Sequence, residues 1–476
     1  MGIRRRYSRS MLLTLLSSSA LAQDLVVVGA RLWDGTGAPV REDAWILIRD
    51  GRIDAIGDSV PPDPATLDFD PELLELDGAT VLPGLIDAHV HLTAVPGAPF
   101  REESEAERLP HIRDQLPTYV AAGVTTVLDT GIFDYALEGL RAELAAGQVG
   151  PRLLTLGPLV APDEGYPAAI VEGFPSVASP DEVGPLLDHL VELETVGVKT
   201  TVEAGFVRPI WPLYTDEVFA ALHDEAAARE LPIYVHATHA DLQLLALERL
   251  KPHAFVHPPL DAPDELVAAL VAEGTYVMPT MALMDMPLTE FQPERLEDPW
   301  LQQLVPPTQL ATAQEAGALD LWHRHMVGVG MPSMPEWFRG FAAWMAVKES
   351  LWTGRVADMQ AVMKTLHDAG VPLVLGSDAG SYEHCPYYFH GVASIRELEL
   401  LGETIGHEAA LVAATRTPAE MLGRDDLGTV EAGKVADLVV VGEDPLESVT
   451  ALRSVRYTIQ GGVARTPEQW LAGETE

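Results

Sequence analysis

The sequence contains a single cysteine, Cys385, among its 476 residues. One cysteine cannot form a disulfide within the chain, so we expect the hydrophobic core and any bound metal to stabilise the fold. Beyond the N-terminal segment, the sequence also has no apolar run long enough to span a bilayer. We therefore expect no stable membrane insertion.

Positive charge is scarce as well. The chain has 31 lysines and arginines against 71 aspartates and glutamates, which gives a formal net charge of −40. Such a surplus keeps a protein soluble and repels phosphate backbones and anionic lipids. Nucleic acid is therefore not an expected partner.

Lysine is the scarcest of the charged residues, and one of the few lysines occupies an unusual place. Lys199 lies in "ETVGVKTTVEAG", an apolar and β-branched run typical of a buried strand. A buried ammonium group is unfavourable unless it is paired or chemically changed. The other four lysines are Lys251, Lys348, Lys364 and Lys434.

The N-terminus has the pattern of a secretory signal peptide over residues 1–22. A basic start, "MGIRRRYSRS", precedes the short apolar stretch "MLLTLLSSSALA", which ends in the small-residue pattern Ala20-Leu21-Ala22. The segment Arg4-Arg5-Arg6-Tyr7 loosely resembles a twin-arginine export signal. We expect an exported protein, periplasmic or secreted.

The rest of the chain divides into two kinds of sequence. Residues 23–82 and 425–476 are rich in short β runs broken by Gly and Asp, which predicts one small β-sandwich domain built from both chain ends. Residues 83–424 alternate strand and helix patterns, which predicts a (β/α)8 TIM barrel and an α/β fold class. A doubly wound open sheet is the rival, but no G-x-G-x-x-G turn follows an early strand.

The alternation breaks over about 282–356, where the sequence is rich in Trp, Met and Pro. Long insertions after barrel strands lie over the mouth where substrates bind. We therefore expect a lid-like insertion here, with tryptophans that either clamp an apolar substrate or belong to the core.

Metal-ligand residue types follow several of the predicted strands. The motif "GLIDAHVHL" places two histidines on the same face of a strand, roughly 6.6 Å apart. Other strands end near further histidines, the lysine and an aspartate. All of these fall on the face where barrel enzymes place their chemistry. The set is His89, His91, Lys199, His236, His257 and Asp378.

These motifs occur in the order and spacing of a known protein superfamily. The segments "LPGLIDAHVHL", "GVTTVLDTG", "VGVKTT", "YVHATH", "FVHPPL", "YVMPTM", "LGSDAG" and "ATRTPAEMLGRDDLGTVEAGKVADLVVVGEDPL" resemble the amidohydrolase superfamily. The similarity is closest to its imidazolonepropionase-like and Xaa-Pro-dipeptidase-like members. It covers nearly the whole mature chain except the insertion.

The resemblance implies a binuclear metal centre. In members of this type, a lysine reacts with carbon dioxide and the resulting carbamate bridges two divalent metals. By this resemblance His89, His91 and Asp378 hold the first metal, His236 and His257 the second, and N6-carboxylated Lys199 both. Zinc fits these ligands best, while manganese, cobalt and iron also fit.

The expected activity is hydrolysis of an amide bond in a small-molecule substrate, of the dipeptide or N-acyl amino acid type. Two metals that share a water would lower its pKa and polarise the scissile carbonyl. Asp378 is the expected proton carrier, from the attacking water to the leaving amine.

Several alternatives stay open. Lys199 could instead form a Schiff base, or pair structurally with Glu203 or another acid. The same site could serve a lactonase, esterase, cyclic imidase or deaminase, although deaminases of this superfamily usually lack the bridging lysine. A third class is a non-catalytic binding protein on a retained barrel.

Four residues are candidates for substrate contact. His239 follows the "YVHATH" strand, Arg208 follows the lysine strand, and the other two lie in the loop "SYEHCPYYFHG" after Asp378. That loop also holds Cys385. The four candidates are His239, Arg208, Tyr388 and His390. The oligomeric state is open, although relatives often form homo-oligomers.

Overall fold

The computed structural model describes residues 24–63, 66–96, 105–169, 173–205, 210–315, 335, 337–338, 340–341, 348–380 and 386–473. The expected signal peptide, Arg208 and Cys385 lie outside these residues, as does much of the insertion. No helix in the described ranges combines the length and the apolar character needed to cross a membrane.

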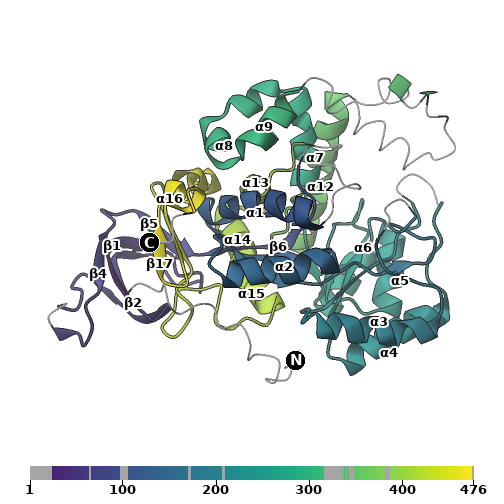
Figure 1. Ribbon diagram of the computed structural model, residues 1–476, viewed down its shortest axis with the longest axis horizontal. Helices are drawn as coiled ribbons and strands as arrows, with labels where there is room; N and C mark the ends of the chain where they lie inside the picture. The colour runs from purple at the N-terminus through teal and green to yellow at the C-terminus, as the bar shows by residue number, and fades with distance from the viewer. Residues whose placement is uncertain are drawn as a thin grey trace.

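Both ends of the chain contribute to one eight-stranded sheet, at the left of Figure 1. Strands β5 and β15 pair antiparallel and so join the two ends. The sheet curls until Arg52, at the start of β3, bridges Val435 just before β15. The expected composite β domain is thus a single curled sheet in the described residues. Its strands are β1 (Leu25–Leu32), β2 (Arg41–Arg49), β3 (Arg52–Asp58), β4 (Glu72–Glu75), β5 (Thr80–Pro83), β15 (Leu438–Val441), β16 (Val455–Gln460) and β17 (Val463–Arg465).

The curled sheet encloses its own hydrophobic core. Alternate residues of β1 and β2, such as Leu25, Val27 and Ile46, point inward and are almost fully buried. These residues share one face of their strands, as the period-two geometry of a strand requires, and Val26 and Leu47 on the opposite face are buried as well. Burial of these aliphatic side chains therefore explains why the short β-rich segments from the two ends of the chain assemble into one sheet.

In the described residues, the middle of the chain forms two parallel sheets. The first contains β6 (Leu85–Val90), β7 (Val124–Asp129) and β8 (Arg152–Thr155). The second contains β11 (Val198–Thr201), β12 (Ile233–His236), β13 (Ala254–Phe255) and β14 (Tyr276–Val277). A short pair, β9 (Ala161–Pro162) and β10 (Ser176–Val177), lies between them in the sequence.

Isolated bridges connect these two sheets in the order of the predicted barrel. Val160, which follows β8 in the sequence, bridges Thr200 of β11, and the backbone N–H of Val196 donates to the carbonyl of Thr155 at the end of β8. On the other side, residues 373–379 lie between β14 and β6, because Leu373 bridges Val277 and Ala379 bridges Val90. The α/β class is confirmed, but the described strands are two sheets linked by bridges and not one continuous closed barrel.

Helices follow the strands in the predicted alternation. Local signals fix their ends: Thr215 accepts the backbone N–H of Val218 at the start of α4, and Gly274 ends α6 in the left-handed conformation. The helices are α1 (Glu105–Ala121), α2 (Asp134–Ala145), α3 (Pro180–Glu192), α4 (Asp216–Ala228), α5 (Ala240–Arg249), α6 (Asp264–Glu273), α12 (Glu349–Asp368), α13 (Val392–Ile405), α14 (His407–Ala413), α15 (Arg416–Met421) and α16 (Pro467–Leu471).

The first part of the insertion is helical and lies at the top of Figure 1. It comprises α7 (Ala282–Asp285), η3 (Met286–Glu290), η4 (Pro293–Glu297), α8 (Pro299–Leu304) and α9 (Pro307–Gln314). Trp322 and Trp344 lie outside the described residues, and Trp352 belongs to α12. The lid role of this insertion stays a prediction.

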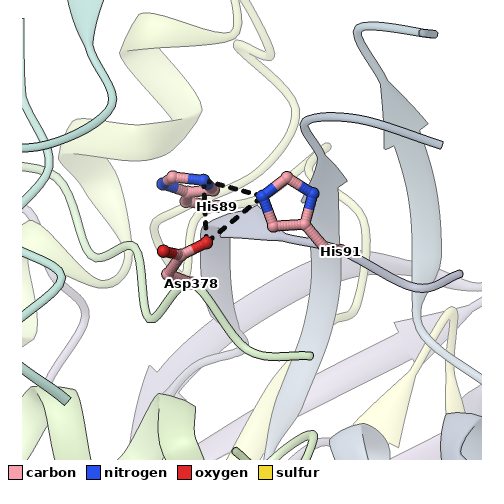
Figure 2. A group of neighbouring side chains, drawn as sticks. All are labelled: His89, His91 and Asp378. Carbon is pink, nitrogen blue, oxygen red and sulfur yellow. Dashed lines mark hydrogen bonds and ion pairs between the residues drawn. The ribbon is translucent and has the colours of Figure 1, made fainter. Parts of the chain in front are cut away.

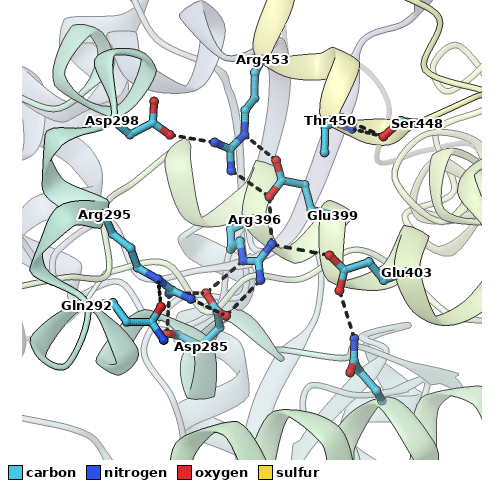
Figure 3. A network of polar contacts seen from close by, with 11 residues as sticks. Asp285, Gln292, Arg295, Asp298, Arg396, Glu399, Glu403, Ser448, Thr450 and Arg453 are labelled. Atoms are coloured by element: carbon cyan, nitrogen blue, oxygen red, sulfur yellow. Dashed lines mark hydrogen bonds and ion pairs between the residues drawn. The ribbon is translucent and has the colours of Figure 1, made fainter. Parts of the chain in front are cut away.

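A network of ion pairs fastens the insertion to the rest of the molecule (Figure 3). Asp285, at the end of α7, accepts hydrogen bonds from Arg295 in η4 and from Arg396 in α13. Glu399 of α13 in turn binds Arg396 and Arg453, which lies in η5 (Val449–Ser454). Because Asp285 and Glu399 are buried, their charges need these guanidinium partners.

Candidate metal centre

Two predicted ligands come from β6 and one from the 373–380 segment that packs beside it. His89 lies within β6, His91 follows that strand, and Asp378 lies opposite them (Figure 2). The two Nε2 atoms are 3.3 Å apart, and each lies 3.2 Å from Asp378 Oδ1. These three side chains offer one ligand atom each, all within 4.8 Å of one another.

The donor set fits a bound cation. His89 Nδ1 donates to the carbonyl of Val256 at 2.9 Å, which leaves Nε2 as the unprotonated nitrogen. That nitrogen faces Asp378 Oδ1, so two electron-rich atoms approach each other inside the protein. A divalent ion between them would turn this repulsion into coordination, and the Val256 carbonyl would orient the imidazole.

Lys199 reaches the same place from β11. Its Nζ lies 3.3 Å from His89 Nε2 and donates to Thr130 Oγ1 at 3.1 Å. The side chain is 2% exposed, and burial lowers the pKa of its amine from 10.5 to about 8. Among the described residues, no carboxylate forms an ion pair with it.

Glu203, the acid that could have paired with Lys199, forms its hydrogen bonds with other residues. Glu203 accepts hydrogen bonds from the backbone N–H of Gly205 and from the N–H and hydroxyl of Thr238. It also lies 3.9 Å from His236 Nε2. The alternative in which Glu203 neutralises Lys199 is therefore not what the structure contains.

His236 and His257 lie next to this group. His236 ends β12, and its ring centroid is 4.5 Å from that of His257, which in turn is 5.0 Å from that of His89. His257 Nδ1 is 3.1 Å from Thr280 Oγ1. The structure thus brings all six predicted ligands into one neighbourhood, although only His89, His91 and Asp378 already converge on a single point.

The protonation states suit metal binding. Burial lowers the pKa of His89, His236 and His257, to about 4 for His257, so these imidazoles are neutral near pH 7. Burial alone would raise the pKa of Asp378, but His89 and the hydrogen bond from His91 hold it well below 3.8. Neutral imidazole and ionised carboxylate are the forms that bind divalent metals.

The candidate substrate residues have different surroundings. His239 is the N-cap of α5 and is partly exposed, and its Nε2 has no hydrogen-bond partner among the described residues. Tyr388 is buried and donates its hydroxyl to the carbonyl of Leu283 in α7. Arg208 falls outside the described residues.

His390 is engaged inside the protein on both ring nitrogens. Nδ1 lies 2.6 Å from the hydroxyl of Tyr119, and Nε2 lies 3.0 Å from the carbonyl of Ala94. The side chain is buried, and burial lowers its pKa to about 4. This geometry favours a role in holding the loop after His91 over a contact with substrate.

Several neighbours of the site were not predicted. Asp129, at the end of β7, accepts the backbone N–H groups of Leu92 and Gly131, and so fixes the chain around His91. A side chain at position 131 would meet the His91 imidazole at 2.9 Å, which explains the glycine there. The signal was present in "VLDTG", where a carboxylate follows an apolar strand.

Aromatic rings border the second pair of ligands. Tyr166 packs against His236 with ring centroids 4.9 Å apart, and Trp211 packs against Tyr166 at 5.0 Å. Trp211 follows the predicted lysine strand in the sequence, but no pattern in the sequence connects Tyr166 and Trp211 to each other or to His236.

The family model named Amidohydrolase family matches residues 80–464. The chain belongs to the amidohydrolase family, which confirms the resemblance noted in its motifs. It is therefore a hydrolase of carbon–nitrogen bonds, and members of this family generally bind a metal. No curated protein matches the sequence significantly.

Solved structures share the fold at low sequence identity. A Xaa-Pro dipeptidase with bound methionine in the active site is 22% identical, with a TM-score of 0.71 over 93% of this chain and 100% of the other. A prolidase complexed with N-methylphosphonate-L-proline is 20% identical, with a TM-score of 0.69 over 93% and 99%. Molinate hydrolase is 21% identical, with a TM-score of 0.67 over 94% and 96%.

Proposed function

We propose that this chain is an exported, binuclear metal-dependent amidohydrolase that cleaves an amide bond in a dipeptide or an N-acyl amino acid. The observation that carries the proposal is the convergence of His89, His91 and Asp378, with Lys199 Nζ 3.3 Å from His89 Nε2. His236 and His257 would complete a second site beside the first. In this proposal the two parallel sheets and the 373–379 segment act as one closed (β/α)8 barrel.

Carboxylation would resolve the cost of burying Lys199. The neutral amine is the form that adds to carbon dioxide, releasing a proton as the carbamate forms. A pKa lowered to about 8 makes this neutral form accessible near physiological pH. The product is an anionic group with two oxygens, which is the kind of ligand that two divalent ions could share.

The protein residues would bind and orient, and one would carry the proton. When bound, two divalent ions, most simply Zn²⁺, would act as Lewis acids and lower the pKa of a coordinated water. Asp378 is ionised, so its carboxylate can accept a proton from the attacking water and deliver it to the leaving amine. The neutral histidines keep their lone pairs for coordination.

The substrate class is supported by the structures that share this fold. Two of those described above are a Xaa-Pro dipeptidase and a prolidase, whose names indicate cleavage of a peptide bond. Molinate hydrolase shows that the same fold also serves another substrate. Hydrolysis of other C–N or C–O bonds is therefore the alternative outcome of a substrate screen.

Metal content tests the centre directly. The mature protein, purified with bicarbonate and without chelator, should contain about two equivalents of divalent metal by elemental analysis. Lys199→Ala should lose most of this metal, whereas Lys364→Ala, which removes an exposed lysine paired with Asp368, should keep it. One equivalent or none in the parent, or full retention in Lys199→Ala, would refute the bridging role.

Substrate screening tests the activity. Metal-loaded protein should hydrolyse members of a panel of Xaa-Pro and other dipeptides and N-acyl amino acids, and Lys199→Ala should not. Turnover confined to lactones, esters, cyclic imides or deaminase substrates would replace the proposed substrate class. Export can be tested by fractionation of cells, with a variant altered at Ala20 and Ala22 as the control.

A further inference from the structure

Asp87 is a fully buried carboxylate two residues before His89 in β6. Each of its oxygens accepts two hydrogen bonds: Oδ1 from the backbone N–H groups of His89 and Ser377, both at 3.1 Å, and Oδ2 from the hydroxyls of Ser377 and Ser394, at 2.5 and 2.6 Å. A buried carboxylate with this many donors is fixed in one orientation. None of these contacts is used in the catalytic proposal above.

The contacts of Asp87 join three separate parts of the chain. His89 belongs to β6, Ser377 to the segment that carries Asp378, and Ser394 to α13. Ser377 binds Asp87 through both its backbone and its side chain, so its own position is fixed. The Ser377 hydroxyl oxygen also accepts the backbone N–H of Ala379 at 3.1 Å.

Asp378 therefore lies between two residues that this cluster holds. Its φ is +56°, a left-handed conformation that residues other than glycine adopt infrequently. Such a backbone persists when its surroundings determine it fully. Here Asp378 N–H donates to the His89 carbonyl and His91 N–H donates to the Ala379 carbonyl, both at 2.8 Å, so the turn is also joined directly to β6.

We propose that Asp87 is a positioning residue of the metal centre. Through its hydrogen bonds to His89 and Ser377, Asp87 sets His89 and Asp378 at coordinating distance, and Ser394 of α13 holds Asp87 itself in place. Asp87 does not touch a metal or substrate. It acts by fixing two backbone segments whose side chains, His89 and Asp378, converge within 3.2 Å. This inference rests on the metal centre of the proposed function.

The test measures metal binding by the full-length mature protein, with cobalt(II) alone as the probe. Metal-free parent, Ser377→Ala, Ser394→Ala and Asp87→Asn are titrated against a competing chelator, and the visible absorption of bound cobalt reports its coordination. Thr404→Val is the matched control, because Thr404 is also on α13 and, in the part of the chain that the structure describes, its hydroxyl donates only to the Leu400 carbonyl of the same helix.

We expect Ser377→Ala and Ser394→Ala to weaken one of the two cobalt equivalents by about 10- to 100-fold, the usual effect of removing a group that orients a metal ligand. The cobalt absorption of that equivalent should also change, while Thr404→Val matches the parent. The two serine variants decide the question if Asp87→Asn fails to fold.

Two outcomes would overturn the inference in distinguishable ways. Parent-like cobalt affinity and absorption in both serine variants would show that Asp87 has no positioning role, while the metal centre stands. A parent that binds no cobalt would refute the metal centre itself, and the role of Asp87 with it.

Discussion

Replacing Lys199 with methionine should stabilise the metal-free protein while removing its metal binding. Burial lowers the pKa of Lys199 from 10.5 to about 8, and at 1.36 kcal/mol per pH unit this difference corresponds to roughly 3 kcal/mol at neutral pH. Methionine keeps an unbranched chain in the same space without the charge. Losing the hydrogen bond to Thr130 costs about 1 kcal/mol, so the expected net gain is about 2 kcal/mol.

The pH dependence identifies the cause. An unfolded chain keeps the ordinary lysine pKa, so between pH 8 and 10.5 it binds more protons than the folded protein does. The destabilisation of the folded parent by its buried, protonated Lys199 is therefore complete below about pH 8 and decreases as the pH rises towards 10.5. The advantage of Lys199→Met should be present at pH 7 and close to zero at pH 10.

The assay is urea unfolding of chelator-treated, bicarbonate-free protein, followed by tryptophan fluorescence at both pH values. Lys364→Met is the control: Lys364 is exposed and pairs with Asp368, so the change should stay within about 0.5 kcal/mol at either pH. The reasoning would be refuted if Lys199→Met were less stable than the parent at pH 7, or if it exceeded the stability of the parent by the same amount at pH 7 and pH 10. Adding metal and bicarbonate should reverse the order, because only the parent binds them.

Three further changes test other parts of the argument. Asp378→Asn keeps an oxygen but loses the proton acceptor, so turnover should fall by about 10²- to 10⁴-fold while elemental analysis still finds metal. Asp285→Asn removes the buried carboxylate that Arg295 and Arg396 share, although Arg396 keeps its ion pair with Glu399, and should cost about 3 kcal/mol at pH 7 in urea unfolding. Burial works to raise the pKa of Asp285, but the arginines lower it below 3.8, so that cost should persist down to about pH 4 and shrink only below it. Burial raises the pKa of Glu397 from 4.5 to about 8, so the folded parent loses stability as the pH rises from 4.5 to 8. Glu397→Gln has no charge to bury, so its urea unfolding midpoint should exceed that of the parent by a margin that grows from pH 5 to pH 8.

The sequence was most informative where chemistry and periodicity coincide. A lysine inside an apolar β-branched run, two histidines with strand spacing and strand-ending residues with metal affinity predicted six metal ligands, and the structure brings these six side chains into one neighbourhood. The β-rich texture at both ends likewise predicted one composite domain, which the pairing of β5 with β15 now joins in a single sheet.

The strands predicted to end near His257 and Asp378 are shorter or less regular in the structure, for local physical reasons: β13 ends at Phe255, and no regular strand of the described residues contains Asp378. Pro258 follows His257 and Pro279 follows Met278, so neither strand can continue its ladder of backbone hydrogen bonds. The last predicted strand contains Asp378 with positive φ, and Gly380 with φ +98°, which breaks regular pairing. Periodicity detects burial, and burial extends beyond the regular strands here.

Only the tertiary structure decided which atoms meet. Asp87 and Ser377 are 290 residues apart, and Lys199 and His89 are 110 apart, and nothing local indicates that either pair is in contact. The sequence determines which metal-ligand side chains are available, and the alternation of strand and helix places their backbones at the carboxyl ends of the parallel strands. The tautomer of His89, the left-handed turn at Asp378 and the donors around Asp87 depend on contacts between distant segments, so they arise only when the chain has packed.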